Sequence, residues 1–311
     1  MSDPGKIKRS WLLFTTSLQV IRQHRKLLLF PLVTSVCSVV TMLFFLAPAL
    51  LYPSGHSLSE LAHWETLGRQ FGLELQGSGS RVRPNGYFYG YLAIVYLVSM
   101  FLATFFNAAF YNEILKALAG EPVSVRAGLR FAWFRVRSIL MWSLFAGAVG
   151  LVIKALEERF GWVGRWVMRF VGVVWSVASV FAIPVLIRED GTNPLAMLRH
   201  SAATLRKTWG ESLVGYVGVT VGSWLILLGS IAFLAGAIAL SLLLKSPVYV
   251  FLAIFAWLAA MFLLGYLVSV AGHVYRCALY VYASEGVVPA PYTPELMDAA
   301  WKVKKPDPSP R

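Results

Sequence analysis

The sequence predicts an all-helical membrane protein in which six helices cross the bilayer as one bundle. Of its 311 residues, 58% are apolar and only 14% are charged, whereas soluble domains carry roughly a quarter charged residues. The mean hydropathy is +0.65, and the chain holds 11 Trp, 13 Tyr and 20 Phe, more apolar side chain than a core of this size encloses. Apolar side chains therefore face lipid, and an ordinary soluble enzyme is excluded.

The spans are defined by predominantly apolar runs of about 20 residues, the length that crosses about 30 Å of hydrocarbon. They cover residues 27–52, 86–112, 138–156, 167–187, 212–244 and 248–275, with an outer loop at 53–84. The charged stretch between the third and fourth spans indicates the turn of a helical hairpin, and Pro184 is expected to kink the fourth span. Residues 1–283 then form a single transmembrane domain, followed by a mobile tail at 284–311.

The distribution of basic residues predicts the orientation of the chain. Six spans place both termini on one side, and the N-terminus, residues 113–137, residues 188–211 and the tail hold most of the Lys and Arg. Because basic loops stay in the cytoplasm, we expect both termini there. Topology thus accounts for the net charge of +13, and no nucleic-acid partner is expected.

A basic amphipathic segment precedes each odd-numbered span. The expected apolar stripes are Trp11, Phe14, Leu18 and Ile21; Val125, Leu129, Ala132 and Val136; and Leu195, Leu198, Ala202, Leu205 and Trp209. Asn193 and Pro194 are suited to begin the third helix. The second and third segments also share a spacing, Leu-Arg followed seven residues later by Arg. We therefore expect a pseudo-threefold repeat of units, each an interfacial helix followed by a transmembrane hairpin.

The arginines of the second and third segments are the candidate binding residues. Interfacial helices lie in the headgroup layer with Arg directed toward lipid phosphates. Arg130, Arg137, Arg199 and Arg206 are therefore expected to bind anionic lipid headgroups. The alternative is that these helices only brace the bundle.

Several short strings along nearly the whole chain carry a family resemblance. They are Arg9-Ser-Trp11, Lys26-Leu-Leu-Leu-Phe30-Pro31, Phe106-Asn107-Ala-Ala109, Ala155-Leu-Glu-Glu158, and Arg199-His-Ser-Ala202 leading to Thr208-Trp-Gly-Glu211. With these strings the chain resembles a family of bacterial multi-pass membrane proteins that has no assigned function. In layout it is also similar to the membrane domain found beside glycerophosphodiester phosphodiesterases. The resemblance implies a bacterial inner-membrane protein and no particular chemistry.

The outer loop contains a weak metal-site candidate. His56, Glu60 and His63 share one side of an expected helix, and their spacing is compatible with gripping one metal ion. A carboxylate-bridged site needs further ligands on facing helices, and the sequence supplies none. Cys37 and Cys277 are too far apart in the sequence to form a C-x-x-C pair. A solvated surface helix is favoured, and neither a metal nor another cofactor is expected.

Polar residues inside the spans are few. Asn107, Ser179 and His273 are the candidates for a polar path across the membrane. Glu157 and Glu158 are expected to form salt bridges at the hairpin turn with Lys154, Arg159 or Arg165, because no nucleophile and base stand at reactive spacing around them. Gly218 and Gly222 form a GxxxG pattern, which favours either packing within the monomer or a homo-oligomeric face.

Three function classes remain, and the first is favoured. It is a non-enzymatic, lipid-interacting scaffold or envelope-homeostasis factor whose partners are anionic membrane lipids. The first alternative is a channel or transporter for a small solute. The second alternative is a membrane enzyme acting on lipid, supported only by the titratable groups of Glu157, Glu158 and His273.

Overall fold

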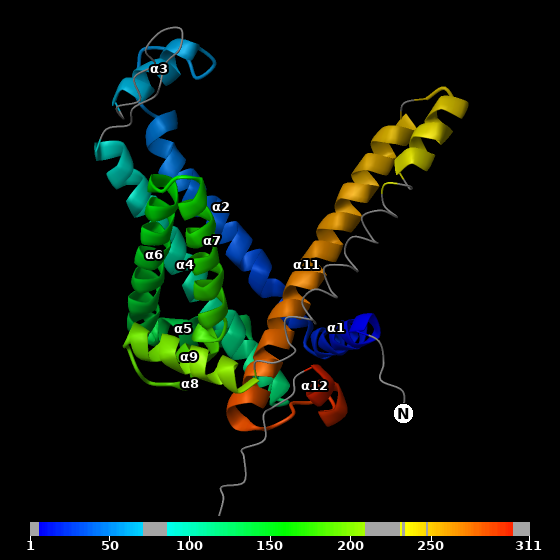
Figure 1. Ribbon diagram of the computed structural model, residues 1–311. Helices are drawn as coiled ribbons and strands as arrows, with labels where there is room; N and C mark the ends of the chain where they lie inside the picture. The colour runs from blue at the N-terminus through cyan, green and yellow to red at the C-terminus, as the bar shows by residue number, and fades with distance from the viewer. Residues whose placement is uncertain (1–5, 71–85, 209–230, 232–233, 247, 301–311) are drawn as a thin grey trace, which may run out of the picture.

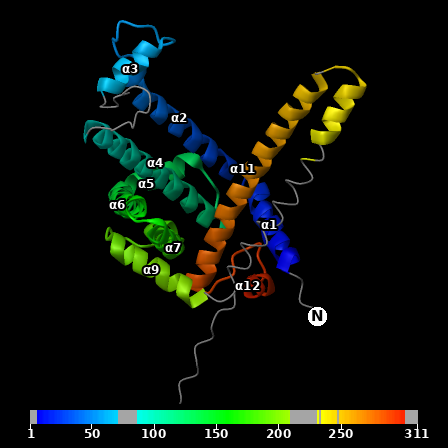
Figure 2. The same cartoon turned by 45° about the horizontal axis from the view of Figure 1, so that its top comes forward.

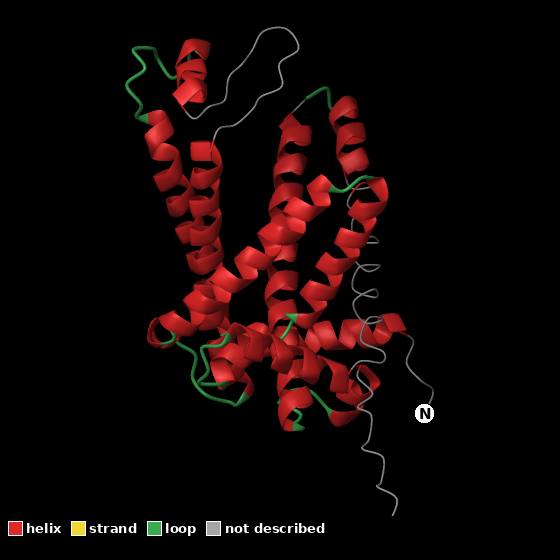
Figure 3. Ribbon diagram, turned by 60° about the vertical axis from the view of Figure 1, so that its left-hand side comes forward, coloured by secondary structure: helices red, strands yellow, loops and turns green. Residues whose placement is uncertain are grey.

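The computed structural model describes residues 6–70, 86–208, 231, 234–246 and 248–300, and these residues form helices and connecting loops without a strand (Figures 1 and 3). The elements are α1 (Lys6–Gln23), the 3-10 turn η1 (Arg25–Leu28), α2 (Leu29–Leu50), α3 (Leu61–Gln70), α4 (Gly86–Leu118), α5 (Val125–Phe134), α6 (Val136–Arg159), α7 (Trp162–Ala178), α8 (Ala182–Arg188), α9 (Pro194–Thr208), α11 (Val248–Glu285) and α12 (Pro294–Ala300). The all-helical fold class is confirmed.

Helices long and apolar enough to cross a membrane are found at five places in the described residues. They are Arg25–Pro48, Gly86–Leu118, Val136–Arg159, Gly164–Arg188 and Val248–Glu285. These correspond to the first four expected spans and the sixth. The expected fifth span, 212–244, lies mostly outside the described residues, and only the short apolar helix Leu234–Leu243 represents it. The six-span count and the pseudo-threefold repeat stay predictions.

The long helices stand above a layer of short ones. In Figures 1 and 3, α1, α5, α9 and α12 lie around one end of the bundle, and α3 lies at the opposite end. Seen from the direction of Figure 2, α4 lies between α2 and the hairpin of α6 and α7. Helix α4 is the central element, because it packs against α2, α5, α6, α8 and α11.

The core lies at the end that carries the short helices. Phe30, Ile114, Ile139, Leu186 and Val274 are fully buried there and come from five different parts of the chain. Toward the other end the long helices expose large apolar side chains, which is the pattern of a surface solvated by lipid rather than water. The tight core therefore holds the short helices in fixed positions.

Glycines bring α6 close to α4. A Cβ at Gly150 would lie 2.8 Å from the Tyr96 hydroxyl, and one at Gly147 would lie 3.3 Å from Leu97. Gly265 of α11 does not have this role among the described residues, because a Cβ there meets nothing within 4 Å.

Two segments differ from the expected bounds. Helix α4 continues to Leu118, so Glu113, which follows the expected end of the second span at residue 112, lies in a helix and is fully buried. Beyond the transmembrane helices, the described part of the expected mobile tail is packed, because Tyr292 and Met297 are buried and α12 contacts α1. Burial of apolar surface outweighs the cost of ordering this segment.

The fourth span is interrupted at residues 179–181, which fits the kink expected from Pro184. Proline has no N–H to donate to the carbonyl four residues earlier, so α7 ends at Ala178 and Pro184 lies in the first turn of α8. The Ser201 hydroxyl of α9 forms hydrogen bonds with two backbone groups at this interruption. It accepts the Phe181 N–H at 3.0 Å and donates to the Ala178 carbonyl at 2.6 Å.

Candidate functional site

Each of the three expected interfacial segments contains a helix, and local capping explains two of the helix starts. The Ser124 hydroxyl accepts from the Ala127 N–H at 3.5 Å at the start of α5. At the start of α9, the Asn193 side-chain carbonyl accepts from the N–H of Leu195 at 3.0 Å, and Pro194 is the first helical residue. This confirms the expected pair of an Asn cap and a first-turn proline.

A buried carboxylate fixes the start of α5 against α4. One oxygen of Glu113 accepts the Ser124 backbone N–H at 2.7 Å. The other oxygen accepts from Lys116 Nζ and from Asn112 Nδ2, both at 3.0 Å. Three donors therefore satisfy a fully buried charge, which is the condition under which a buried ion is tolerated.

Gly128 allows α5 to approach α4 closely. A Cβ at this position would lie 2.8 Å from Glu113 Cγ, 2.9 Å from the Ala109 carbonyl oxygen and 2.9 Å from Phe30 Cζ. Because backbone oxygens do not yield, a side chain there would push α5 outward. Gly128 and Glu113 together set the distance between α5 and the core.

The basic residues at this end fall into a paired set and an unpaired set. Arg135 donates to the Glu189 carbonyl at 2.7 Å and pairs with Asp190 at 2.5 Å, and Arg188 pairs with Glu285 at 3.1 Å. Arg130, Arg137, Arg199 and Arg206 are exposed, and within the part of the chain that the structure describes no ion pair engages them. The guanidinium of Arg130 lies 5.5 Å from the centre of the Phe134 ring.

The buried side of α9 differs from the expected stripe. Met197, Ser201 and Leu205 are buried, whereas Leu195 is 52% exposed. The buried stripe of α9 is rotated about the helix axis relative to the expected one, and this rotation directs the Ser201 hydroxyl toward the interruption between α7 and α8. Arg199 and Arg206 remain on the exposed side.

An open groove lies between α2, α4 and α5. It encloses about 950 Å³. Its lining consists of Val33, Cys37, Phe105, Phe106, Ser124, Arg126, Ala127, Leu129, Arg130 and Trp133. No Asp or Glu is among the described residues that line it. The groove brings Arg130, an expected site residue, together with Arg126, which the sequence placed only beside the apolar stripe.

Two residues of the expected polar path, Ser179 and His273, have separate hydrogen-bond partners. His273 Nδ1 lies 2.9 Å from the Tyr111 hydroxyl, which also accepts from Arg276 at 2.8 Å. The Ser179 hydroxyl donates to the Trp175 carbonyl at 2.8 Å. Among the described residues no hydrogen bond joins any two of Asn107, Ser179 and His273.

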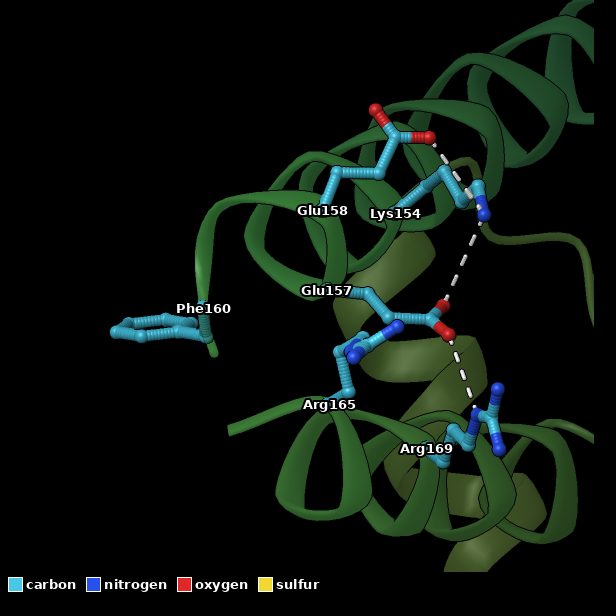
Figure 4. A pocket seen from close by; sticks show the side chains of 6 residues that line it. All are labelled: Lys154, Glu157, Glu158, Phe160, Arg165 and Arg169. Carbon is cyan, nitrogen blue, oxygen red and sulfur yellow. Dashed lines mark hydrogen bonds and ion pairs between the residues drawn. The ribbon is translucent and has the colours of Figure 1, made fainter. Parts of the chain in front are cut away.

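The hairpin turn carries the expected salt bridges (Figure 4). Lys154 pairs with Glu158 at 3.6 Å and with Glu157 at 4.0 Å, as predicted. The partner across the hairpin is Arg169, whose Nε lies 3.3 Å from Glu157, in place of Arg159 or Arg165. These side chains line a cavity of about 520 Å³ and tie α6 to α7.

The outer-loop metal candidates do not converge. His56 lies 3.1 Å from Glu60, whereas His63 is buried and lies 2.6 Å from the Ser54 hydroxyl. Hydrogen bonds from Ser57 and then from His56 hold the pKa of Glu60 below its usual range. In the described residues no group of three or more His, Cys, Asp or Glu is placed to hold a metal ion. Gly218 and Gly222, the residues of the expected GxxxG pattern, lie outside the described residues.

The long apolar helices of this all-helical fold define a multi-pass helical membrane protein. A family model described as "Family of unknown function (DUF6159)" matches residues 87–289, more than half of the chain, and the chain belongs to this family. The match includes the α4 and α5 walls of the groove. No curated protein and no solved structure matches the chain, so the similarity to the phosphodiesterase membrane domain has no support there.

Proposed function

We propose that this chain is a non-enzymatic protein of the bacterial inner membrane that binds anionic lipid at the end carrying α1, α5 and α9. In this proposal both termini are cytoplasmic, and the protein acts as a scaffold or envelope-homeostasis factor. One observation carries it. Within the described residues, four exposed arginines at this end are in no ion pair, namely Arg130, Arg137, Arg199 and Arg206, whereas Arg135 and Arg188 are paired.

Electrostatics favours lipid phosphate as the partner of these arginines. The cytoplasmic leaflet is anionic, and each Lys or Arg near its surface contributes about 1 kcal/mol to attraction. A guanidinium group also presents paired donors that match phosphate oxygens. Helices α1, α5 and α9 lie across the end of the bundle (Figure 1). In this proposal they lie in the headgroup layer, where their arginines reach lipid phosphates.

The two alternative classes have weaker support. A channel or transporter needs a connected polar path, and Ser179 and His273 have separate hydrogen-bond partners. A lipid-modifying enzyme needs an available acid or nucleophile, and Glu157 and Glu158 are engaged in salt bridges. Solute flux into liposomes or turnover of lipid by the purified protein would support these classes instead.

Native mass spectrometry of the purified protein in mixed micelles tests the proposal. The micelles contain equal phosphatidylglycerol and phosphatidylcholine, and the bound lipids are counted by class. We expect Arg130→Gln with Arg137→Gln, and Arg199→Gln with Arg206→Gln, each to reduce the excess of phosphatidylglycerol several-fold.

The matched control is Arg159→Gln with Arg165→Gln, which removes the same charge from exposed residues at the hairpin end. It should leave the excess unchanged. An equal loss in all three variants, or no loss in any, would overturn the proposal.

A further inference from the structure

We propose that the groove between α2, α4 and α5 holds one glycerophospholipid with an anionic headgroup. Its phosphate lies between Arg126 and Arg130, and an acyl chain lies along the apolar floor. This inference rests on the proposed function in assigning anionic lipid to this end of the molecule. It adds a defined single site and a further binding residue, Arg126.

The floor of the groove is suited to an acyl chain. Val33 and Cys37 come from α2, and Phe105 and Phe106 come from α4, so two neighbouring spans supply it. Burial of methylene groups against such a floor contributes about 0.8 kcal/mol for each group. The volume of about 950 Å³ lies within the range of about 300–1,000 Å³ typical of ligand sites.

The rim is suited to a phosphate. Arg126 and Arg130 are four residues apart on α5, so they share a helix face, and both are exposed. No Asp or Glu is among the described lining residues, and the Glu113 carboxylate at the start of α5 already accepts from three donors. The lining therefore carries an uncompensated positive charge that an anionic group complements.

The arrangement of the lining also suits a phospholipid. Helix α5 lies across the end of the bundle, whereas α2 and α4 run along it (Figure 1). The lining arginines belong to α5 and the apolar floor belongs to α2 and α4, so we place the headgroup at α5 and the acyl chain along the two spans. Trp133 lines the same rim and is 68% exposed, as expected for an aromatic residue at the membrane interface. A headgroup at α5 thus directs its acyl chain between α2 and α4.

Cys37 provides a direct reporter of occupancy. It lines the groove, whereas Cys277 is fully buried. A maleimide added to the folded protein therefore labels Cys37. The full-length protein is reconstituted in nanodiscs of phosphatidylcholine alone or with one tenth phosphatidylglycerol. We expect phosphatidylglycerol to slow Cys37 labelling at least threefold.

Two groove variants and one control complete the test. Arg126→Gln should abolish the protection by removing a phosphate ligand. Ala127→Leu should reduce the lipid retained in native mass spectrometry by one molecule, because it fills the groove and keeps both arginines. Arg22→Gln on α1 removes an exposed charge at the same end and should leave the protection intact.

The outcomes separate this inference from the proposed function. Equal labelling in both lipids, or protection that persists in Arg126→Gln and Ala127→Leu, would overturn the single groove site. A phosphatidylglycerol excess that no longer depends on Arg137, Arg199 and Arg206, with the Cys37 protection intact, would overturn the wider function and leave the groove site standing.

Discussion

The Ser124 backbone N–H donates to the fully buried carboxylate of Glu113 at 2.7 Å, so the first turn of an interfacial helix is attached to a charge inside a membrane span. Lys116 and Asn112 donate to the other oxygen of the same carboxylate. Helix α5, which carries Arg126 and Arg130 on the groove rim, therefore depends on one residue of α4 for its position.

Replacing Glu113 with Gln should destabilise the protein by on the order of 2 kcal/mol, because the neutral amide directs an N–H₂ group at donors that need an acceptor. Unfolding in SDS and dodecyl maltoside mixtures measures this change. Glu121→Gln, which neutralises an exposed carboxylate in the following loop, is the matched control and should have little effect. Similar stability of the two variants would contradict the role of Glu113.

Replacing Gly128 with Ala should displace α5 and cost about 1–3 kcal/mol, as expected for overpacking against a backbone oxygen. Gly172→Ala on α7 is the control, because its Cβ would meet only Ile153 at 3.9 Å. The maleimide reaction of Cys37 provides a second measurement. It should become faster in Gly128→Ala and stay the same in Gly172→Ala.

The orientation can be tested with single cysteines at two exposed positions at opposite ends of the bundle. Ser59→Cys and Gly191→Cys are each made in a background with Cys37→Ser and Cys277→Ser. If the termini are cytoplasmic, a membrane-impermeant maleimide should label residue 59 in right-side-out spheroplasts and label residue 191 only after lysis. The reverse pattern would invert the topology.

Docking of the C-terminal segment should weaken at high pH. The Tyr292 hydroxyl lies 2.7 Å from that of Ser17, and burial raises the pKa of Tyr292 above its usual range. A raised pKa means that the docked state resists ionisation, so stability is complete below about pH 10, the pKa of a free tyrosine, and falls as the pH rises above it.

Spin labels at the exposed residues Gln19 and Glu295 measure the separation of α1 and α12. The distance distribution should stay unchanged up to about pH 10, the pKa of a free tyrosine, and broaden as the pH rises above it. Tyr292→Phe has no ionisable hydroxyl and should broaden less. Identical pH responses of the two proteins would argue against Tyr292 as the titrating group.

The salt bridges of the hairpin turn should matter far less than Glu113. Lys154 and Arg169 are mostly exposed, and exposed pairs typically contribute about 0–1 kcal/mol. Glu157→Gln should therefore shift unfolding only slightly, and the shift should shrink further in high salt. A loss as large as that of Glu113→Gln would show that the turn is more deeply buried in the membrane than its exposure indicates.

Five of the six expected spans are found among the described residues, because hydropathy over a full bilayer thickness is a strong signal. The end of α4 could not be predicted in this way. Asn112 and Glu113 are polar residues of the kind that begin a loop. No local pattern indicates that the backbone N–H of Ser124, eleven residues after Glu113, donates to the buried Glu113 carboxylate. Hydropathy therefore places the end of α4 too early. A buried carboxylate with distant partners is a property of the tertiary structure.

The candidate site was partly predictable for a similar reason. Spacing within one segment identified Arg130, and neighbours in sequence identified the bridges of Lys154 to Glu157 and Glu158. Arg126 became a candidate only when α2 and α4 were seen to meet α5, and Arg169 only when the register of the hairpin was known. Contacts between separate helices depend on packing that one sequence does not specify.

The bonds that Ser201 makes to Phe181 and Ala178 have a mechanical consequence. If α9 moved along the membrane surface by itself, the interruption in the fourth span would lose these partners at a buried place where water cannot replace them. The surface helix and the lower end of the span therefore move as one rigid piece. If α9 binds lipid headgroups as proposed, a force that they apply to it reaches the fourth span instead of being absorbed at the membrane surface.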